Sequence, residues 1–427
     1  GQCSSCGQWN TLVEEVALPS DSVALAPTSA TPMLIADIDP EASAPRSTAI
    51  GELDRVLGGG LVPGSVTLLG GEPGIGKSTI LLQLLAGWTG QSLYVTAEES
   101  AQQVRLRAER LDAVRPNLWL FAETALPHII AAIDDVKPDF VVIDSIQTVH
   151  DPAIGSAPGS VTQVRGCAQQ LVNIAKLRNI PVILVGHVTK EGSLAGPRVL
   201  EHIVDTVLSF EGERHHALRL LRATKHRFGP TSELGLFEMA GVGLVGVPDP
   251  SQLFLGDRRT GVPGSAIAPT MEGHRPIVVE VQALTTPAPP NVPARRTALG
   301  IDSNRLALLL AVLQQRARVA VQQQDVYAST VGGVRLVEPG LDLAVCLAIA
   351  SAIVDRPIPS DMVAFGEVGL GGELRQVAHT PRRLSEAARL GFTRVIAPKN
   401  SPAPEGDAIR MIRVGTLPEA LAAASLV

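Results

Sequence analysis

The stretch Gly71-Glu72-Pro73-Gly74-Ile75-Gly76-Lys77-Ser78 fits the pattern G-x-x-x-x-G-K-[ST] of a phosphate-binding loop (P-loop). The apolar run Val66–Leu69 predicts a strand before it, and Thr79–Ala86 predicts a helix after it. The glycines let backbone N–H groups turn toward phosphate oxygens, and the helix N-terminus favours the same anion. A glycine-rich turn could match by chance, but this strand and helix context favours a nucleoside triphosphate site. In such a site Lys77 reaches the terminal phosphates and Ser78 holds Mg²⁺.

Carboxylates end two further predicted strands. Asp144 follows the apolar run Phe140–Ile143, and beside a phosphate-binding loop such an Asp holds the Mg²⁺ shell. Glu98 and Glu99 follow the run Tyr94–Ala97, where a carboxylate could act as general base toward the attacking water. The alternative is a charge favoured by the N-terminus of the next helix, and that alternative is stronger for Glu99 than for Glu98.

Length and composition limit the class of protein. The chain has 427 residues, of which 45% are hydrophobic and 18% charged, and this length suggests two or three domains. It has no apolar run of about 20 residues, so we expect no membrane span. The first residues do not have the pattern of a secretory signal, and four cysteines do not make a disulfide framework, so we expect a cytoplasmic protein. The net charge of −6 means that nucleic-acid contacts must come from local basic loops.

The chain divides by composition. Residues 17–46 are rich in Pro, Ser, Ala and Thr, which is typical of a flexible linker. From residue 47 to about 210, short apolar runs alternate with helical stretches, so we expect an α/β fold whose parallel sheet is covered by helices on both faces. The proline run 285–293 is the second break, and composition alone places a domain boundary there. Two apolar helices are predicted beyond it, at 304–315 and 341–354.

The first sixteen residues contain Cys3 and Cys6 in a CxxC pair. Two thiolates on one turn supply two of the four ligands of a tetrahedral Zn²⁺ site, so residues 1–16 resemble half of a zinc ribbon. A second cysteine pair is missing from this sequence, and an idle pair is an equally good interpretation.

Two basic segments could contact anionic ligands. Lys190 and Arg198 belong to a glycine-punctuated loop after the predicted strand Val182–His187, and ligands bind at the carboxyl ends of parallel strands. Lys225 and Arg227 are one residue apart on an extended segment, so both point to one face and could enter a neighbouring subunit's nucleotide site. The alternatives are a solvated turn and a surface hairpin.

The order of these motifs resembles the bacterial RadA family, also called Sms, over essentially the whole chain. The segments that carry the resemblance are Ser47–Gly64, the phosphate-binding loop, Glu98-Glu99, Asp144-Ser145 and Lys225–Gly229. The resemblance implies a RecA-like P-loop ATPase core at 47–257 and a C-terminal α+β, Lon-protease-like domain at 258–427. It therefore moves the expected boundary from the proline run to Arg258.

The resemblance also implies a function. RadA proteins are hexameric, DNA-stimulated ATPases of the helicase type that act in recombination and repair by branch migration. The implied ligands and partners are ATP, Mg²⁺, single-stranded or branched DNA and a recombinase of the RecA type, with Zn²⁺ in a four-cysteine ribbon. The implied catalytic residues are Lys77, Glu98, Asp144, Lys225 and Arg227, and the implied DNA-binding residues are Lys190 and Arg198. His226 stands where the family usually has Asn.

The C-terminal domain lacks the residues of a Lon-type peptidase, which needs a Ser nucleophile activated by Lys. The matching segment Val337–Asp342 offers no Ser, and Gln376–Arg383 supplies Arg382 and Arg383, which stay protonated and cannot act as bases. We therefore expect a non-proteolytic scaffold for ring assembly and DNA contact. Two alternatives differ in class: a RecA-fold signalling or scaffold ATPase that is indifferent to DNA, and an ATP-dependent peptidase.

Overall fold

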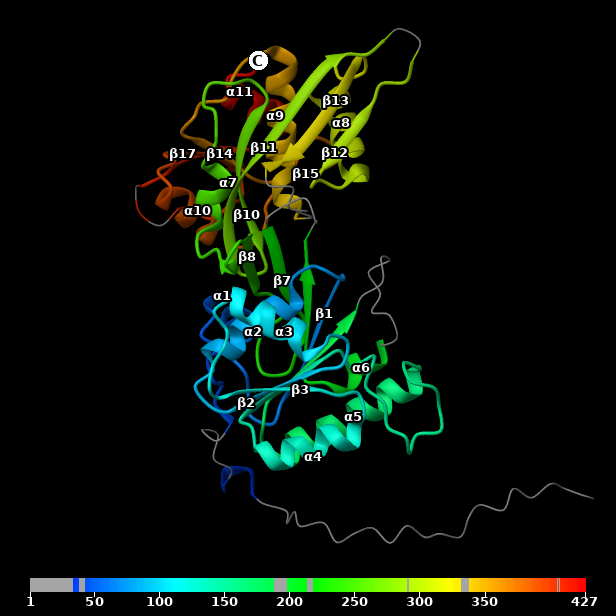
Figure 1. Cartoon of the computed structure of the whole chain (residues 1–427). Helices are drawn as coiled ribbons and strands as arrows, with labels where there is room; N and C mark the ends of the chain where they lie inside the picture. Colours follow the sequence, from blue (N-terminus) through cyan, green and yellow to red (C-terminus); the bar gives the residue numbers. More distant parts are fainter. Residues whose placement is uncertain are drawn as a thin grey trace, which may run out of the picture. The chain divides into compact units, whose positions relative to one another are not determined.

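The computed structural model describes residues 34–37, 43–187, 198–212, 218–289, 292–331, 338–404, 406 and 408–427. Residues 1–43 and 44–427 are separate units. In the first unit the structure describes a 3-10 helix, η1 (Ile35–Asp37), within the predicted linker. Cys3, Cys6 and Lys190 lie outside the described residues. All further elements belong to the second unit (Figure 1).

A large sheet has the strand order β3-β2-β4-β5-β1-β6-β7-β8-β9. The strands from β3 to β6 are paired in parallel, and β7, β8 and β9 continue the sheet antiparallel. These strands are β1 (Val66–Gly71), β2 (Ser92–Thr96), β3 (Leu118–Ala122), β4 (Phe140–Asp144), β5 (Val182–His187), β6 (Thr206–Glu211), β7 (Leu218–His226), β8 (Leu234–Ala240) and β9 (Gly243–Gly246). The strands predicted from the buried apolar runs are all present. Strand β5 has the predicted bounds, β1 and β4 extend two residues and one residue past the predicted runs, and β2 begins two residues before Tyr94.

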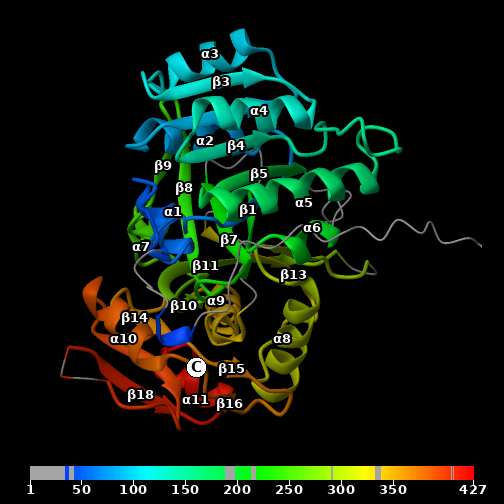
Figure 2. The same ribbon diagram turned by 90° about the horizontal axis from the view of Figure 1, so that it is seen from below.

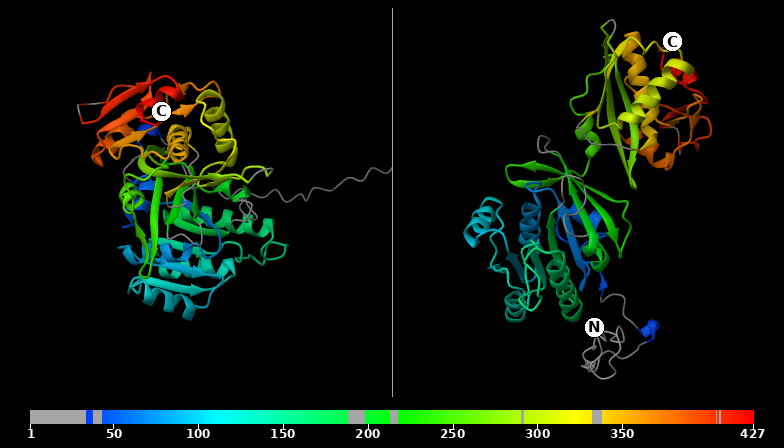
Figure 3. Two further views of the ribbon diagram at one scale, coloured as in Figure 1. Left: turned by 90° about the horizontal axis from the view of Figure 1, so that it is seen from above. Right: turned by 90° about the vertical axis from the view of Figure 1, so that its right-hand side faces the viewer.

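Helices cover both faces of this sheet, as the continuous apolar strands predict. Side chains of α1 (Gly51–Val56), α2 (Lys77–Gly87) and α3 (Ala101–Arg110) share one core with Tyr94 and Phe140. Side chains of α4 (Leu126–Val136), α5 (Val161–Arg178) and α6 (Arg198–Ile203) share another core with the alternate residues of the same strands. Figure 3 shows α4 and α5 together on one side of the sheet. The residues of β1, β2 and β4 are all buried, so only the ends of these strands are free to carry a site.

The ends of β1, β2 and β4 place the sequence motifs at one edge. Strand β4 lies between β2 and β5, and β5 lies beside β1. All four run parallel, so their carboxyl ends meet at the same edge of the sheet. Register pairs Thr96 of β2 with Asp144 of β4 and Gly71 of β1 with His187 of β5. The phosphate-binding loop, Glu98 and Asp144 therefore leave the sheet side by side.

Further sheets follow along the chain. Strands β10 (Ser265–Glu272), β11 (Arg275–Pro287), β13 (Gln324–Thr330) and β12 (Arg296–Leu299) form one sheet in this order. Strands β14 (Met362–Ala364), β17 (Arg394–Pro398) and β18 (Arg410–Val414) form another, and β15 (Glu367–Val368) pairs with β16 (Leu374–Arg375). The helices here are α8 (Ser303–Arg316), η4 (Pro339–Leu341), α9 (Asp342–Val354), α10 (Thr380–Arg389) and α11 (Leu417–Ala423) (Figure 2). The two predicted apolar helices are confirmed as α8 and α9.

The proline run does not separate two domains. It joins β11, which ends at Pro287, to β12, which begins at Arg296, and both strands pair with β13. A boundary at this run would divide one sheet, so the boundary drawn from composition alone is wrong: the prolines mark a connection between strands. Residue 258 lies between α7 (Pro250–Leu255) and β10, and we keep it as the proposed boundary. Among the described residues, no helix combines the length and the apolar character needed to span a bilayer.

Candidate nucleotide and metal site

The phosphate-binding loop connects β1 to α2, as predicted. Gly74 and Gly76 have φ angles of 81° and 116°, a region of backbone conformation that favours glycine. Gly71 has an ordinary φ, but a Cβ there would lie 2.7 Å from the carbonyl oxygen of Phe210 in β6. Gly74 and Gly76 therefore permit the turn of the loop, and Gly71 permits close packing of the end of β1 against β6.

The Lys77 side chain folds back onto the phosphate-binding loop. Its Nζ atom donates hydrogen bonds to the carbonyl oxygens of Gly71, at 2.7 Å, and Glu72, at 3.0 Å. Burial lowers the pKa of Lys77, while the carboxylates of Asp144 and Glu98 act in the opposite direction. The ammonium group has three donors, two of which bind these carbonyl oxygens, so one remains for a phosphate oxygen.

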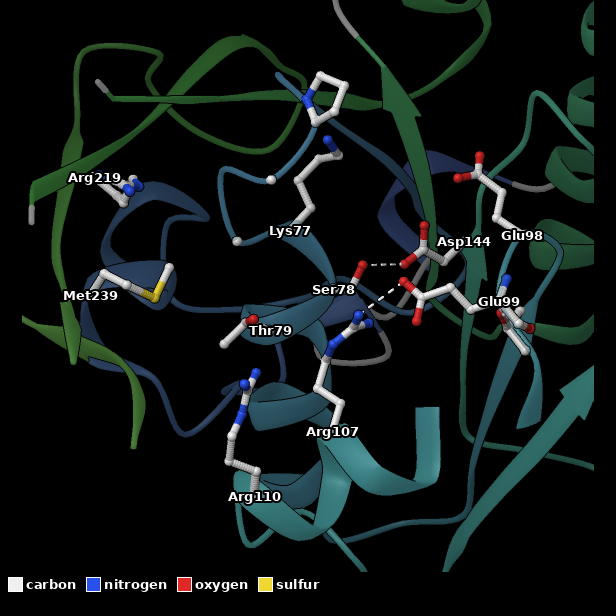
Figure 4. Close-up of a pocket in the computed structure, with 14 residues that line it drawn as sticks. Lys77, Ser78, Thr79, Glu98, Glu99, Arg107, Arg110, Asp144, Arg219 and Met239 are labelled. Atoms are coloured by element: carbon white, nitrogen blue, oxygen red, sulfur yellow. Dashed lines mark hydrogen bonds and ion pairs between the residues drawn. The ribbon is translucent and has the colours of Figure 1, made fainter. Parts of the chain in front are cut away.

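The metal side of the site is built on Asp144. The Ser78 hydroxyl donates to Oδ2 of Asp144 at 2.7 Å, and the Tyr94 hydroxyl donates to the same oxygen at 2.7 Å. Figure 4 shows Ser78 and Asp144 facing each other across the pocket floor. Hydroxyl and carboxylate oxygens are the ligands that Mg²⁺ prefers, so the chemistry of these donors fits the metal of an ATPase site.

The two neighbouring glutamates differ in their partners. The Ser145 hydroxyl donates to Oε1 of Glu98, whereas Oε1 of Glu99 accepts from the Arg107 guanidinium at 2.9 Å. Glu99 thus makes an ion pair with α3, the helix that follows it. This arrangement agrees with a structural role for Glu99 and leaves Glu98 as the better placed base.

These side chains line one cavity of about 530 Å³. Ligand sites have volumes of about 300–1,000 Å³, so the cavity has room for a nucleotide. Its lining comprises Pro73, Gly74, Gly76, Lys77, Ser78, Thr79, Thr96, Glu98, Glu99, Arg107, Arg110, Asp144, Arg219 and Met239 (Figure 4). The predicted Lys77, Ser78, Glu98 and Asp144 are therefore brought together. Three residues predicted to bind the nucleotide, Gly71, Glu72 and Ile75, belong to the loop but are not part of this lining.

Sequence reasoning missed the arginines of this cavity. Arg107 and Arg110 are one turn apart on α3, which a helical projection after Glu99 could have indicated. Arg219 comes from β7, and its Nε atom donates to the Ile75 carbonyl oxygen at 3.2 Å. No local pattern connects Arg219 to a loop more than 140 residues earlier, because only the strand order β1-β6-β7 brings it there.

Lys225 and Arg227 do not line the cavity of their own chain. Lys225 lies in β7, and its Nζ atom donates at 2.7 Å to the carbonyl oxygens of Glu201 and Val204, at the end of α6. Burial lowers the pKa of Lys225. Arg227 follows the strand, makes an ion pair with Asp205 at 3.1 Å and keeps half of its side chain exposed.

The remaining predicted residues can be placed in part. His226 contacts the Thr206 hydroxyl through Nδ1 at 2.9 Å and the Leu57 carbonyl oxygen through Nε2 at 3.2 Å, so it ties the end of β7 to the loop after α1. Arg198 begins α6, and its side chain is not described. Cys3, Cys6 and Lys190, as noted above, fall outside the described residues.

The segments that match the peptidase site of the family are joined by an ion pair in which the arginine is buried. Arg383 of α10 is 1% exposed and donates to both carboxylate oxygens of Glu338, at 2.7 and 2.9 Å. The same guanidinium also donates to the carbonyl oxygens of Pro269 and Ala378, each at 2.9 Å. A guanidinium so engaged offers neither a nucleophile nor a base.

Comparisons with known proteins now identify the family. A family described as AAA domain matches residues 41–193. A DNA repair protein RadA of Listeria monocytogenes is 50% identical, over 99% of this chain and 94% of that protein. A DNA repair protein RadA of Bacillus subtilis is 49% identical over the same shares of the two chains. The chain belongs to the RadA family.

Membership in the RadA family fixes the general activity. The chain is a DNA repair protein of this family with a RecA-like ATPase domain, and the cavity described above lies in that domain. Among solved structures, a KaiC-like protein of Pyrococcus horikoshii is 21% identical over 48% of this chain and 100% of that chain, with a TM-score of 0.41.

Proposed function

We propose that this chain is a DNA-stimulated ATPase motor that promotes branch migration of recombination intermediates. The observation that carries the nucleotide part of the proposal is the convergence of Lys77, Ser78, Glu98 and Asp144 on one cavity at the carboxyl edge of a parallel sheet. These are the parts that a P-loop ATPase needs: a cation for the terminal phosphates, oxygens for Mg²⁺ and a carboxylate for the water.

In this proposal, different residues of the chain bind the phosphates, bind the metal and take up the proton. Bound ATP with Mg²⁺ would supply the phosphoryl group whose hydrolysis drives movement. Lys77 holds and neutralises the terminal phosphates, and Ser78 with Asp144 holds the metal side. Glu98 accepts the proton of the attacking water, while the Ser145 hydroxyl keeps the Glu98 carboxylate in place.

A neighbouring subunit completes the site in this proposal. Neither Lys225 nor Arg227 lines the cavity of its own chain, and we propose that the half-exposed Arg227 reaches a second copy in a hexameric ring. An arginine supplied by a neighbour is worth about 10³–10⁵ in rate in related phosphoryl-transfer sites. Arg227→Ala is therefore expected to abolish hydrolysis in the assembled ring without weakening nucleotide binding. Normal turnover by rings of Arg227→Ala, with ring assembly verified by light scattering, would reject the role.

DNA is proposed to contact the segment that contains Lys190 and Arg198, on either single-stranded or branched substrates. With a net charge of −6 the molecule has no overall attraction for DNA, so such local cations must supply the contacts. Phosphate contacts would make binding independent of sequence and sensitive to salt. A RecA-type recombinase as partner, Zn²⁺ at Cys3 and Cys6 and a cytoplasmic location complete the proposal.

The experiment is branch migration of a fluorescently labelled mobile DNA junction in the presence of ATP. Wild-type protein is expected to convert the junction to products, and Lys77→Ala is expected to fail. Lys176→Ala, an exposed lysine on α5, is the matched control and should behave as wild type. Junctions left unconverted by wild-type protein that hydrolyses ATP would reject the motor.

Two other functions give different results in the same assays. A signalling or scaffold ATPase of this fold would hydrolyse ATP at a rate indifferent to DNA. An ATP-dependent peptidase would cleave an unfolded protein substrate such as casein. The ion pair of Glu338 and Arg383 argues against the peptidase, because it occupies the region where the nucleophile and base would be needed.

A further inference from the structure

One carboxylate oxygen of Asp144 accepts hydrogen bonds from two hydroxyl groups. Ser78 reaches Oδ2 from the first turn of α2, and Tyr94 reaches the same atom from the neighbouring strand β2. Figure 4 shows the other carboxylate oxygen turned away from Ser78. Because the two donors come from different elements, they hold this oxygen from two sides.

The position of the Tyr94 side chain is fixed by its burial. Its side chain is 2% exposed, and its ring lies in the core shared by α1, α2 and α3. The phenolic hydroxyl donates to Oδ2 of Asp144 at 2.7 Å, and the packing of the ring in this core holds it there. The hydroxyl is therefore a fixed donor that solvent does not reach.

We infer that Tyr94 is a positioning residue for the metal side of the nucleotide site, whose hydroxyl holds Asp144 in the orientation that Mg²⁺ requires. The inference rests on the proposed role of Ser78 and Asp144. The Ser78 hydroxyl can offer a lone pair to the metal while its one proton stays on Asp144, so Ser78 belongs to the metal side itself. Tyr94 supplies the donor that takes no part in binding the metal.

A purely structural tyrosine would give a different result on substitution. Removal of a core hydrogen bond lowers stability and affects nucleotide binding with and without metal alike. A positioning residue affects only the metal-dependent part of binding, and loss of such a partner typically lowers metal affinity about 10-fold to 100-fold. The readout must therefore separate metal-free from metal-dependent nucleotide binding.

The experiment measures binding of the fluorescent analogue mant-ATP, first in EDTA and then as free Mg²⁺ is raised. Tyr94→Phe removes a single oxygen atom, so we expect unchanged binding in EDTA and a Mg²⁺ midpoint about 10-fold to 100-fold higher. The chain has two tyrosines, so Tyr327→Phe is the matched control, and its midpoint should equal that of wild type. A wild-type midpoint for Tyr94→Phe, or equal losses with and without Mg²⁺, would overturn the inference.

Asp144→Asn separates the inference from the proposal on which it rests. If Asp144→Asn keeps the wild-type Mg²⁺ midpoint, the metal role of Asp144 is wrong, whatever Tyr94→Phe does. If Asp144→Asn raises the midpoint and Tyr94→Phe does not, only the role of Tyr94 is wrong.

A second measurement remains decisive if Tyr94→Phe does not fold. In the Tyr327→Phe background Tyr94 is the sole tyrosine, so ultraviolet resonance Raman bands of the phenol report its hydrogen bond alone. Addition of Mg²⁺ to the mant-ATP complex is expected to shift these bands. Bands unchanged by Mg²⁺ would show that the phenol does not respond to the metal and would overturn the inference.

Discussion

Two clusters of charged residues in this molecule resemble enzyme sites, and they differ in what their polar groups face. In the nucleotide cavity, Lys77, Glu98 and Asp144 line an open volume of about 530 Å³. In the second cluster, Arg383 and Glu338 face each other, and Glu338 also accepts from the Thr270 hydroxyl at 3.0 Å and the Gly340 amide at 3.1 Å.

The difference shows that charged residues can serve catalysis when they line a cavity and stability when they are paired with each other. A buried charge must be compensated, and the buried guanidinium of Arg383 is compensated by Glu338 and by two backbone carbonyl oxygens of its own chain. The acids of the nucleotide cavity are also hydrogen-bonded, but by hydroxyls that leave carboxylate oxygens beside a cavity. We therefore expect substitutions in the first cluster to change rates and substitutions in the second to change stability.

Among substitutions in the two clusters, Glu98→Gln is expected to have the largest effect on turnover. Loss of a general base lowers the rate by about 10²–10⁴-fold. The amide oxygen of the introduced glutamine can still accept the hydrogen bond from the Ser145 hydroxyl, so we expect little change in stability. Steady-state ATP hydrolysis should fall accordingly, while mant-ATP affinity and the melting temperature stay close to wild type. Glu99→Gln is the matched control and should lose much less activity. If the two variants were equally impaired, Glu98 would not be the base.

Arg383→Met is expected to show the opposite behaviour. Removal of Arg383 takes two charge-assisted hydrogen bonds from Glu338, whose side chain is 21% exposed, and such a loss costs about 1.5–3 kcal/mol of unfolding free energy. Denaturant unfolding followed by fluorescence measures this loss, and ATP turnover of the folded protein should be retained. Adding Glu338→Gln should recover part of the stability. A stable Arg383→Met protein that had lost ATP turnover would break the distinction between the two clusters.

Ser145→Ala tests the support of the proposed base. A hydrogen bond to a charged group is worth about 1.5–3 kcal/mol, so we expect kcat to fall by about tenfold or more with little change in KM. Initial rates across a range of ATP concentrations give both constants. A rise in KM at constant kcat would mean that Ser145 serves nucleotide binding, which would contradict its assignment to Glu98.

The smallest expected effect concerns His226, near the proposed trans-acting residues. Burial lowers the pKa of His226, so the unfolded chain binds its proton more tightly than the folded chain does. The contribution to stability is therefore complete above the unfolded pKa of about 6.5 and is lost as pH falls below it. His226→Asn should flatten the dependence of stability on pH over this range. An unchanged slope in denaturant unfolding at several pH values would contradict the account.

Much of the site followed from local sequence. The glycines of 71–76, the apolar strands and the acids that end them are set by neighbouring residues, so their placement at one sheet edge could be predicted. Arg219 and the role of Tyr94 could not, because they depend on which strands lie beside β1 and β4. Strand β7 also runs on to His226, because its pairing with β6 continues past a bulge at Val207 and Leu208. Pairing between strands, not local propensity, fixes that end.

Steady-state ATP hydrolysis, measured with and without single-stranded DNA across a salt series, tests the central claim most directly. The proposed motor binds the phosphates of DNA, so DNA should strongly raise the rate of ATP hydrolysis by the wild-type protein. Because phosphate contacts weaken with salt, this stimulation should decrease as the salt concentration rises. Glu98→Gln should be inactive in both conditions, which ties the signal to the cavity. Turnover by the wild-type protein that is the same with and without DNA at every salt concentration would contradict the motor and favour the signalling ATPase.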